Sequence, residues 1–368
     1  MAVKYHKDAF PPDKLDWKEL AEPLSNASDA IGRYDSFLSI IPNPRLLVSP
    51  LIVNEAVTSS RIEGTRTTVH EVLAFEAGNT NISQSQKDDI QEVSNYRSAL
   101  QHAIKMLKDF PITGRVLKTA HAELLKGVRG QYKSPGLYRT EQNWIGLTNN
   151  IEEARYIPIS PNELEDAMAK WERYVNSSND PSLVKIAIAH AEFESIHPFL
   201  DGNGRIGRIM IPLMLCTENK MSSPCFYMSE FFEHRNNEYQ NRLLAVSADN
   251  DWTEWCEFFL GAIETQAKEN LSKAQAIHDL YNKTRTVLLE ISKSSYAEKI
   301  IDKLFEAPIF SAKDLTQMPS INDKTARRLM NMLKDAGIIK EFIPHSGQRA
   351  AIMVFPKLLE ITENISIK

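Results

Sequence analysis

Apolar residues recur every three or four positions along most of this chain, which is the spacing of one buried helix face. The pattern predicts helices over 25–38, 50–63, 68–75, 90–107, 113–126 and 205–215, others that start at 160 and 180, and more to about 292. The segment that starts at 180 is apolar on more than one side, so we expect it to be a central helix. The chain is therefore predicted to be mainly α.

Capping residues mark several of the predicted helix ends. Ser49 and Pro50 fit the N-cap and first position of one helix, and Gly64 fits the residue just past its end. Thr68 followed by Glu71 has the spacing of a capping box.

Two regions break the helical pattern. Residues 79–88 are polar and predict a loop, and residues 127–160 are rich in glycine, proline and asparagine. Within the second region, short apolar runs at 144–145 and 156–157 flank a Thr-Asn-Asn turn and predict a β-hairpin over about 143–158.

The C-terminal part has a different order of elements. Helices are predicted at 296–305, 312–317 and 322–335, the last ended by Gly337, followed by strands at 338–343 and 351–355. This order is typical of a winged helix-turn-helix. Residues 296–355 hold nine Lys and Arg against seven Asp and Glu, which is a weak charge for binding DNA. A DNA-binding role and a role in protein contacts or dimer packing both stay open.

Composition narrows the class of protein. The net charge of -5 provides no global attraction to nucleic acid or to an anionic membrane. Three cysteines without CxxC spacing argue against a disulfide framework or a zinc site and favour a reducing compartment. No signal peptide or membrane-spanning run is apparent, so we expect a cytoplasmic protein with no membrane partner.

The densest chemistry lies in residues 197–208, which read HPFLDGNGRIGR. Gly202, Asn203 and Gly204 fall between a loop and the predicted helix at 205–215. Glycines let an anion approach the backbone closely, and the N–H groups and dipole at a helix start favour phosphate.

Charged side chains flank this turn. Asp201 can hold a divalent cation that bridges phosphates. Arg205 and Arg208 lie three residues apart, so they share a helix face and can point at one polyanion. His197 precedes Asp201 by four residues, and an imidazole with an ordinary pKa near 6.5 suits a base that takes a hydroxyl proton.

This stretch resembles the signature of the Fic family of protein adenylyltransferases, HxFx(D/E)GNGRxxR, at every defined position. The resemblance implies transfer of AMP from ATP to a Ser, Thr or Tyr hydroxyl of a protein, including the chain itself, with release of pyrophosphate. His197 would be the base, Asp201 would bind Mg²⁺, and Arg208 would hold the γ-phosphate. The remaining ATP-binding positions that it implies are Gly202, Asn203, Gly204, Arg205 and Gly207. Tyr239 matches a family tyrosine near the adenine.

A second motif precedes the first by about 145 residues. Ser59, Glu63 and Gly64 match the Fic inhibitory pattern (S/T)xxxE(G/N), and Glu63 stands at a predicted helix C-terminus, where the dipole disfavours negative charge. The resemblance implies that Glu63 pairs with Arg208 in place of the γ-phosphate. The predicted hairpin lies where the family has a target-docking flap, with Ile145, Gly146 and Ile157 as its docking residues.

The resemblance implies a Fic-type helical core with a hairpin flap, an N-terminal inhibitory region and a C-terminal winged helix. We expect three parts, at 1–110 with the inhibitory helix at about 50–64, at 111–292, and at 296–357. A homodimer rests on the resemblance alone. Two alternative functions remain: removal of AMP or use of another nucleotide donor at the same site, and a DNA-binding regulator whose core senses nucleotide.

Overall fold

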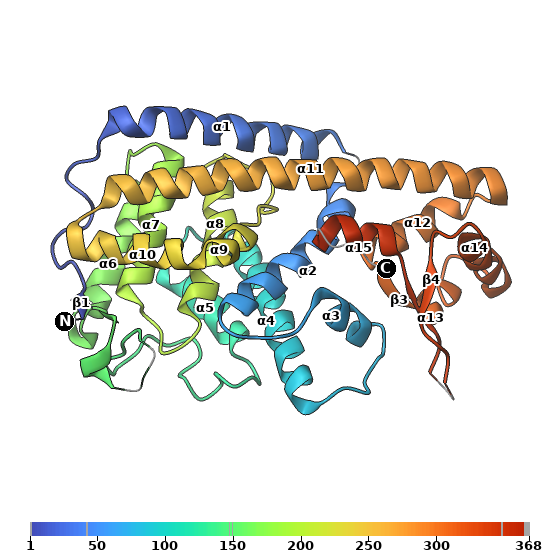
Figure 1. Cartoon of the computed structure of the whole chain (residues 1–368), viewed down its shortest axis with the longest axis horizontal. Coiled ribbons are helices and arrows are strands. Elements are labelled where there is room, and N and C mark those ends of the chain that lie inside the picture. The colour runs from blue at the N-terminus through green and yellow to red at the C-terminus, as the bar shows by residue number, and fades with distance from the viewer. Residues whose placement is uncertain (1, 42, 147, 149, 347–348, 364–368) are drawn as a thin grey trace. The chain divides into compact units, whose positions relative to one another are not determined.

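The computed structural model describes residues 2–41, 43–146, 148, 150–346 and 349–363, and the protein is mainly helical as expected (Figure 1). It divides into two compact units that interleave along the sequence. Unit 1 comprises residues 1–37, 58–65 and 91–269, and unit 2 comprises residues 38–57, 66–90 and 270–368. Among the described residues, none of the helices combines the length and the apolar character needed to cross a membrane. The expected three-part division of the chain stays a prediction.

The α-helices are α1 (Trp17–Ile40), α2 (Pro44–Ile62), α3 (Val69–Glu76), α4 (Gln84–Met106), α5 (Gly114–Leu124), α6 (Leu164–Ser177), α7 (Ser182–Ile196), α8 (Asn203–Thr217), α9 (Ser229–His234), α10 (Asn236–Asp249), α11 (Trp252–Ser292), α12 (Ala297–Glu306), α13 (Ala312–Thr316), α14 (Asp323–Asp335) and α15 (Pro356–Glu363). The strands are β1 (Val3–Lys4), β2 (Tyr156–Ile157), β3 (Ile309–Ser311), β4 (Lys340–Ile343) and β5 (Ile352–Val354). Within the described residues, 3₁₀ turns occur at η1 (Ile151–Glu153) and η2 (Pro161–Glu163).

Helix α7 is the centre of unit 1, as its apolar residues on several faces predict. It packs against α6, α8 and α10, and nearly all of its residues are buried. Two indole N–H groups donate to its backbone, from Trp171 to the Ala189 carbonyl and from Trp255 to the Ala187 carbonyl, each at 2.8 Å. Tryptophan buries a large apolar area, and its N–H needs a partner when buried. Helix α7 ends immediately before His197.

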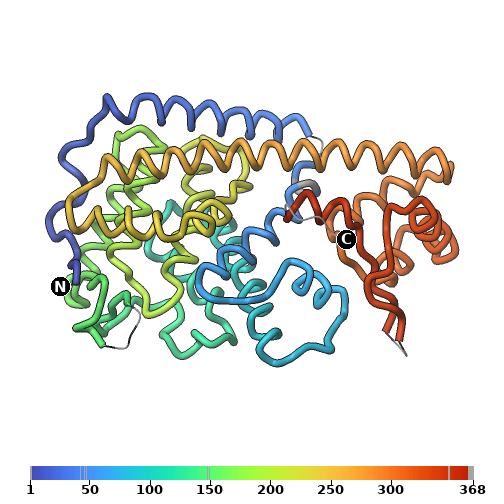
Figure 2. Tube along the Cα trace, viewed as in Figure 1, coloured from blue at the N-terminus to red at the C-terminus, as the bar shows by residue number. Residues whose placement is uncertain are grey.

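The predicted hairpin is not a regular two-stranded ribbon. Ile145 and Tyr156 form a single antiparallel bridge, and Leu147 and Asn149 of the expected turn lie outside the described residues. Strand β2 instead pairs in parallel with β1, so the N-terminus of the chain lies beside this loop (Figure 2). The sequence did not predict β1, because two residues are too few to show a strand pattern.

Several predicted helix starts were wrong. The helix expected from Pro50 begins at Pro44, so Pro50 lies inside it. Proline is favoured at the first position of a helix, and in this helix Pro44 takes that position. Helix α1 begins at Trp17 and not near 25, with Asp16 Oδ1 accepting from the backbone N–H groups of its first turn. Helix α4 begins inside the expected polar loop, where Ser83 and Gln86 cap each other.

Unit 2 contains the C-terminal elements. Helices α12 to α14 and strands β4 and β5 lie close to their predicted positions, whereas β3 and α15 were not predicted. The three strands form one antiparallel sheet in the order β3-β5-β4. The winged helix-turn-helix identity of this part stays a prediction.

Thr68 and Glu71 make both bonds of the expected capping box at the start of α3.

Replacing Thr68 with Ala tests this capping box. Losing an N-cap costs about 1 kcal/mol, which corresponds to roughly fivefold faster amide exchange if α3 opens locally. Hydrogen exchange of the peptide covering residues 69–76 measures the effect. Thr80→Ala, at an exposed loop position, is the control. Equal exchange in the two variants would show that the cap does not stabilise α3.

Candidate functional site

A cavity of about 380 Å³ in unit 1 collects residues from both sequence motifs. That volume lies in the range of small-molecule pockets. The expected site residues that line it are Glu63, Ile145, Gly146, His197, Gly204, Arg208 and Tyr239. The expected residues Ser59, Gly64, Ile157, Asp201, Gly202, Asn203, Arg205 and Gly207 are not among the residues that line it.

The structure holds His197 as a neutral imidazole. Its Nδ1 lies 3.3 Å from the Glu194 carbonyl oxygen, and a carbonyl only accepts, so Nδ1 carries the proton and Nε2 has the lone pair. Burial lowers the pKa of this imidazole to about 4, and the nearby Arg139 guanidinium adds to the shift. At neutral pH the ring can therefore accept a proton at Nε2.

Arg139, which the sequence analysis did not select, fixes the backbone around His197. Its guanidinium is buried and donates to the carbonyls of His197 (2.9 Å), Ile159 (2.5 Å) and Ile196 (3.3 Å). These carbonyls include the end of α7, where backbone groups lack helical partners. His197 itself has a left-handed φ of 51°, so Arg139 stabilises a conformation that a non-glycine residue rarely adopts.

The turn after His197 is closed by two further side chains. Asn203 Nδ2 donates to the Phe199 carbonyl and its Oδ1 accepts from the Phe199 N–H, both at 2.8 Å. His121 Nδ1 accepts from the Gly136 N–H, so its Nε2 donates to the Asp201 carbonyl at 2.8 Å. The Asn203 side chain thus binds the protein's own backbone, and its predicted contact with phosphate stays a prediction.

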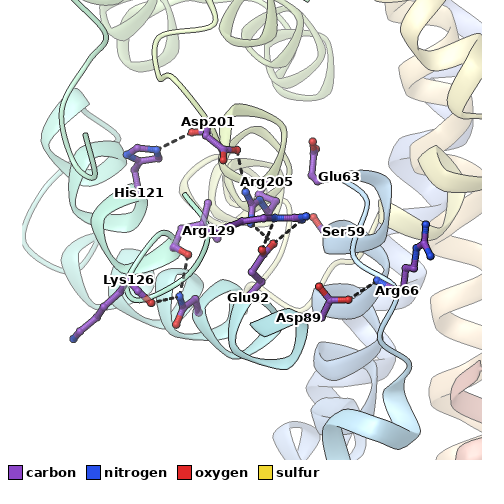
Figure 3. Close-up of polar contacts among 12 residues, drawn as sticks. Ser59, Glu63, Arg66, Asp89, Glu92, His121, Lys126, Arg129, Asp201 and Arg205 are labelled. Atoms are coloured by element: carbon purple, nitrogen blue, oxygen red, sulfur yellow. Dashed lines mark hydrogen bonds and ion pairs between the residues drawn. The ribbon is translucent and has the colours of Figure 1, made fainter. Parts of the chain in front are cut away.

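Arg205 belongs to a buried charge network (Figure 3). Its Nη1 lies 3.1 Å from Glu92 on α4, and its Nη2 lies 3.2 Å from Asp201 Oδ1. Glu92 also pairs with Arg129 at 2.7 Å. The side chains of Arg205 and Glu92 are 3% and 2% exposed, so this network joins α4 to the start of α8 away from solvent. Phosphate binding by Arg205 stays a prediction.

Asp201 is a carboxylate that could contribute one ligand to a divalent cation. Its carboxylate is 37% exposed, and among the described residues no group of three or more His, Cys, Asp or Glu could form a metal site by itself. Mg²⁺ commonly takes one or two carboxylates and completes its shell with water and substrate phosphates. The partly exposed carboxylate of Asp201 is compatible with that requirement, and magnesium binding at Asp201 stays a prediction.

Arg208 contacts Ser59 on α2 and Glu63 just past the end of that helix. Its Nε donates to Ser59 Oγ, and its Nη2 donates to the Ser59 carbonyl and to Glu63 Oε1, each at 2.8 Å. The Arg208 side chain is 2% exposed and that of Glu63 is 34% exposed. The structure therefore brings together the two residues that the sequence analysis paired.

The Glu63 carboxylate lies over the start of α8. A Cβ placed on Gly204 would come within 2.4 Å of Glu63 Oε1, so only glycine permits this approach. Burial raises the pKa of Glu63, but the positive charges of Arg208 and Arg205 outweigh it and hold the pKa below its usual range. An anion thus already lies at the helix N-terminus, where the dipole favours negative charge.

Tyr239 on α10 is buried and faces inward. His190 Nδ1 lies 3.2 Å from the Gly207 carbonyl, so His190 donates there and its Nε2 accepts from the Tyr239 hydroxyl at 2.8 Å. The Tyr239 ring also stacks on Phe232 at 4.4 Å between ring centres. The structure therefore fixes the tyrosine ring as one wall of the cavity.

Comparisons with known proteins agree on one family. Residues 21–105 match the sequence profile of the Fic/DOC family N-terminal region, and residues 111–215 match that of the Fic/DOC family. The protein adenylyltransferase Fic of Drosophila melanogaster is 36% identical over 70 residues, which are 18% of this chain and 14% of that protein. The same protein of Drosophila ananassae is 34% identical over 70 residues. The chain thus matches about a seventh of the length of these relatives.

Solved structures agree in fold. A Fic family protein from Desulfovibrio desulfuricans G20 superposes with a TM-score of 0.61 at 21% identity, over 94% of this chain and 98% of that one. Fic-1 from C. elegans superposes with a TM-score of 0.55 at 15% identity, over 71% of this chain and 74% of that one. At these identities the likeness establishes the fold alone.

Replacing Glu92 with Ala tests the buried network. Removing one member of a buried ion pair costs about 3–5 kcal/mol, and buried Arg205 would keep only the partly exposed Asp201 as a charge partner. We expect thermal unfolding to shift down clearly, and Glu123→Ala, which removes a carboxylate paired with Lys126 near the surface, to have little effect. Equal melting of the two variants would show that the network adds no stability.

The buried neutral histidines of the site predict that the stability of the fold depends on pH. Burial lowers the pKa of His121, His190 and His197 to about 4, 3 and 4. Below the ordinary pKa near 6.5 the unfolded chain binds protons that these rings do not, so they reduce stability as the pH falls from 6.5 toward 4. NMR of labelled histidine should show these three rings neutral at pH 6 and titrating only after unfolding. A midpoint above 6 for His197 would contradict this assignment.

Proposed function

The chain belongs to the Fic/DOC family, and on that premise we propose that it is an autoinhibited protein adenylyltransferase. It would transfer AMP from ATP to Ser, Thr or Tyr hydroxyls of proteins, itself included, and release pyrophosphate. The observation that carries this proposal is the pairing of Arg208 with Glu63 beside a neutral His197 in one cavity. A base and an anion site so close together suit the transfer of a phosphate-bearing group to a hydroxyl.

In this reaction the target hydroxyl oxygen attacks the α-phosphorus of ATP, and the bond to the β-phosphate oxygen breaks. His197 Nε2 takes the hydroxyl proton, and pyrophosphate leaves with the electron pair of the broken bond. The geometry supports this role because the Glu194 carbonyl fixes the tautomer and Arg139 fixes the backbone. Positioning and charge stabilisation supply most of the rate in such transfers.

The phosphates of ATP would bind where Glu63 now lies. The start of α8 provides backbone N–H groups and a favourable dipole, and Arg208 provides a fixed cation for the γ-phosphate. Asp201 would hold Mg²⁺, which supplies charge neutralisation at the phosphates when bound. The exposed Ile145 and the neighbouring Gly146 at the cavity rim would align an extended target segment by backbone pairing.

Autoinhibition follows from competition for one guanidinium. While Arg208 Nη2 donates to Glu63, the γ-phosphate lacks its partner, and the carboxylate repels it from the start of α8. The Ser59 contacts to Arg208 do not involve Glu63, so they persist when the glutamate is removed. Arg208 therefore stays oriented in a variant that lacks only the carboxylate.

We expect Glu63→Gly to raise incorporation of AMP into the chain at least about tenfold. A hydrogen bond between charged groups contributes about 1.5–3 kcal/mol, which is roughly 10–150-fold in an equilibrium. Intact mass spectrometry after incubation with ATP and Mg²⁺ measures the gain of one AMP. The double variant with His197→Ala should show no gain, because the base is missing.

Other results would identify a different activity. If the Glu63→Gly protein gains no more AMP than the wild type, the autoinhibition proposal fails. If it takes up mass only from another nucleotide, or removes AMP from a modified protein without adding it, the site performs one of the alternative reactions.

A further inference from the structure

The N-terminal arm, residues 3–10, is bound to the rest of unit 1 although it belongs to neither sequence motif (Figure 2). Strand β1 lies in this arm and pairs with β2. The Val3 N–H donates to the Arg155 carbonyl at 3.1 Å, and the Tyr5 N–H donates to the Ile157 carbonyl at 3.0 Å. A pairing of two short strands is marginally stable by itself in water, so other contacts must hold the arm in place.

A buried carboxylate on α7 supplies these contacts. Glu192 is fully buried, its Oε1 accepts from the Tyr5 hydroxyl at 2.5 Å, and its Oε2 lies 2.8 Å from His6 Nε2. Among the described residues, both side-chain partners of Glu192 come from the arm. The buried Phe10 ring adds an apolar contact, with its centre 5.1 Å from that of the Tyr174 ring. Because an unpaired buried carboxylate is costly, Glu192 fixes the arm against α7.

Side chains also connect the arm to β2 and to the end of α7. His6 Nδ1 lies 2.7 Å from Ser247 Oγ on α10, and the Ser247 hydroxyl donates to the Tyr156 hydroxyl at 3.3 Å. The Tyr156 hydroxyl in turn donates to the Ser195 carbonyl at 3.0 Å, two residues before His197. A continuous chain of hydrogen bonds therefore joins the arm, β2 and the backbone next to the proposed base.

Strand β2 connects the arm to the cavity. On the edge away from β1, the Ile145 N–H donates to the Tyr156 carbonyl at 2.9 Å, and the Tyr156 N–H donates to the Ile145 carbonyl at 3.1 Å. Both of these residues line the cavity. Strand β2 therefore lies between the arm and the rim residue Ile145, so the arm sets the position of this rim through β2.

We propose that the N-terminal arm is a positioning segment for the protein acceptor, which holds the cavity rim so that a docked segment presents its hydroxyl to His197. This inference rests on the proposed function, since it takes Ile145 and Gly146 as the residues that align the acceptor. The rate of such a transfer depends steeply on the orientation of the attacking group. The phosphates of ATP would bind instead at the start of α8 and at Arg208, so the arm acts on the acceptor and not on the nucleotide.

Two proline substitutions one residue apart test the arm in the Glu63→Gly protein, which the autoinhibition proposal expects to be active. Val3→Pro removes the N–H that bonds to Arg155, because proline has no N–H group. Lys4→Pro is the matched control. Successive N–H groups of a strand point to opposite sides, so that of Lys4 points away from β2, where proline is tolerated.

The Val3→Pro variant should separate the acceptor from the nucleotide. We expect amide exchange of the peptide covering residues 150–158 to be about fivefold faster, because one backbone hydrogen bond that opposes local opening is lost. Incorporation of AMP, followed by intact mass spectrometry, should slow at least about fivefold, because the acceptor is misplaced. The affinity for ATP, measured by calorimetry with His197→Ala added, should stay within about twofold, a small part of a binding free energy. Lys4→Pro should change none of the three.

A second variant covers an arm that tolerates the loss of one backbone bond. His6→Ala removes the connection between Glu192 and Ser247 and should separate transfer from ATP affinity in the same way.

The inference is overturned if both variants leave the exchange of residues 150–158 unchanged, or if Lys4→Pro has the same effect as Val3→Pro. It is also overturned if ATP affinity falls in proportion to AMP incorporation, because the arm would then only maintain the fold. Failure of the Glu63→Gly protein itself to incorporate AMP would count against the proposed function, whereas unchanged exchange counts against this inference alone.

Discussion

The contact of Arg208 with Ser59 and Glu63 is the constraint on which the rest of the site depends. It connects the end of α2 to α8 through three bonds of 2.8 Å, and it places a carboxylate over Gly204 at the start of α8. A buried guanidinium requires such partners, because an unpaired buried charge costs several kcal/mol. An anion that binds at the Nη2 atom of Arg208 must therefore displace Glu63.

The neighbouring motif residues serve mainly to build the turn that presents this anion site. Asn203 and His121 bind backbone atoms of residues 199 and 201, and Arg205 pairs with Glu92 on α4. These side chains bind other parts of the protein, so hydrogen bonds hold the turn in place without a ligand. A preorganised site of this kind loses little free energy to rearrangement when charge develops during a reaction.

The sequence predicted the parts of this arrangement that depend on local chemistry. The capping box at Thr68, the central helix before His197 and the pairing of Glu63 with Arg208 all followed from spacing or from the family resemblance. Arg139 and the strand β1 could not be predicted in this way, because their partners are backbone atoms far along the chain. Pro50 misplaced a helix start, because a proline favours the first turn but does not exclude a helix that begins earlier.

The most direct test of the competition for Arg208 is the ratio of ATP to ADP affinity, measured by calorimetry in proteins that carry His197→Ala to prevent turnover. Only ATP has the γ-phosphate that would replace Glu63. With Glu63 present, the account predicts similar affinities for the two nucleotides. With Glu63→Gly added, it predicts that ATP gains roughly 10–150-fold over ADP, the range of a hydrogen bond between charged groups. The same ATP to ADP ratio in both proteins would contradict the account.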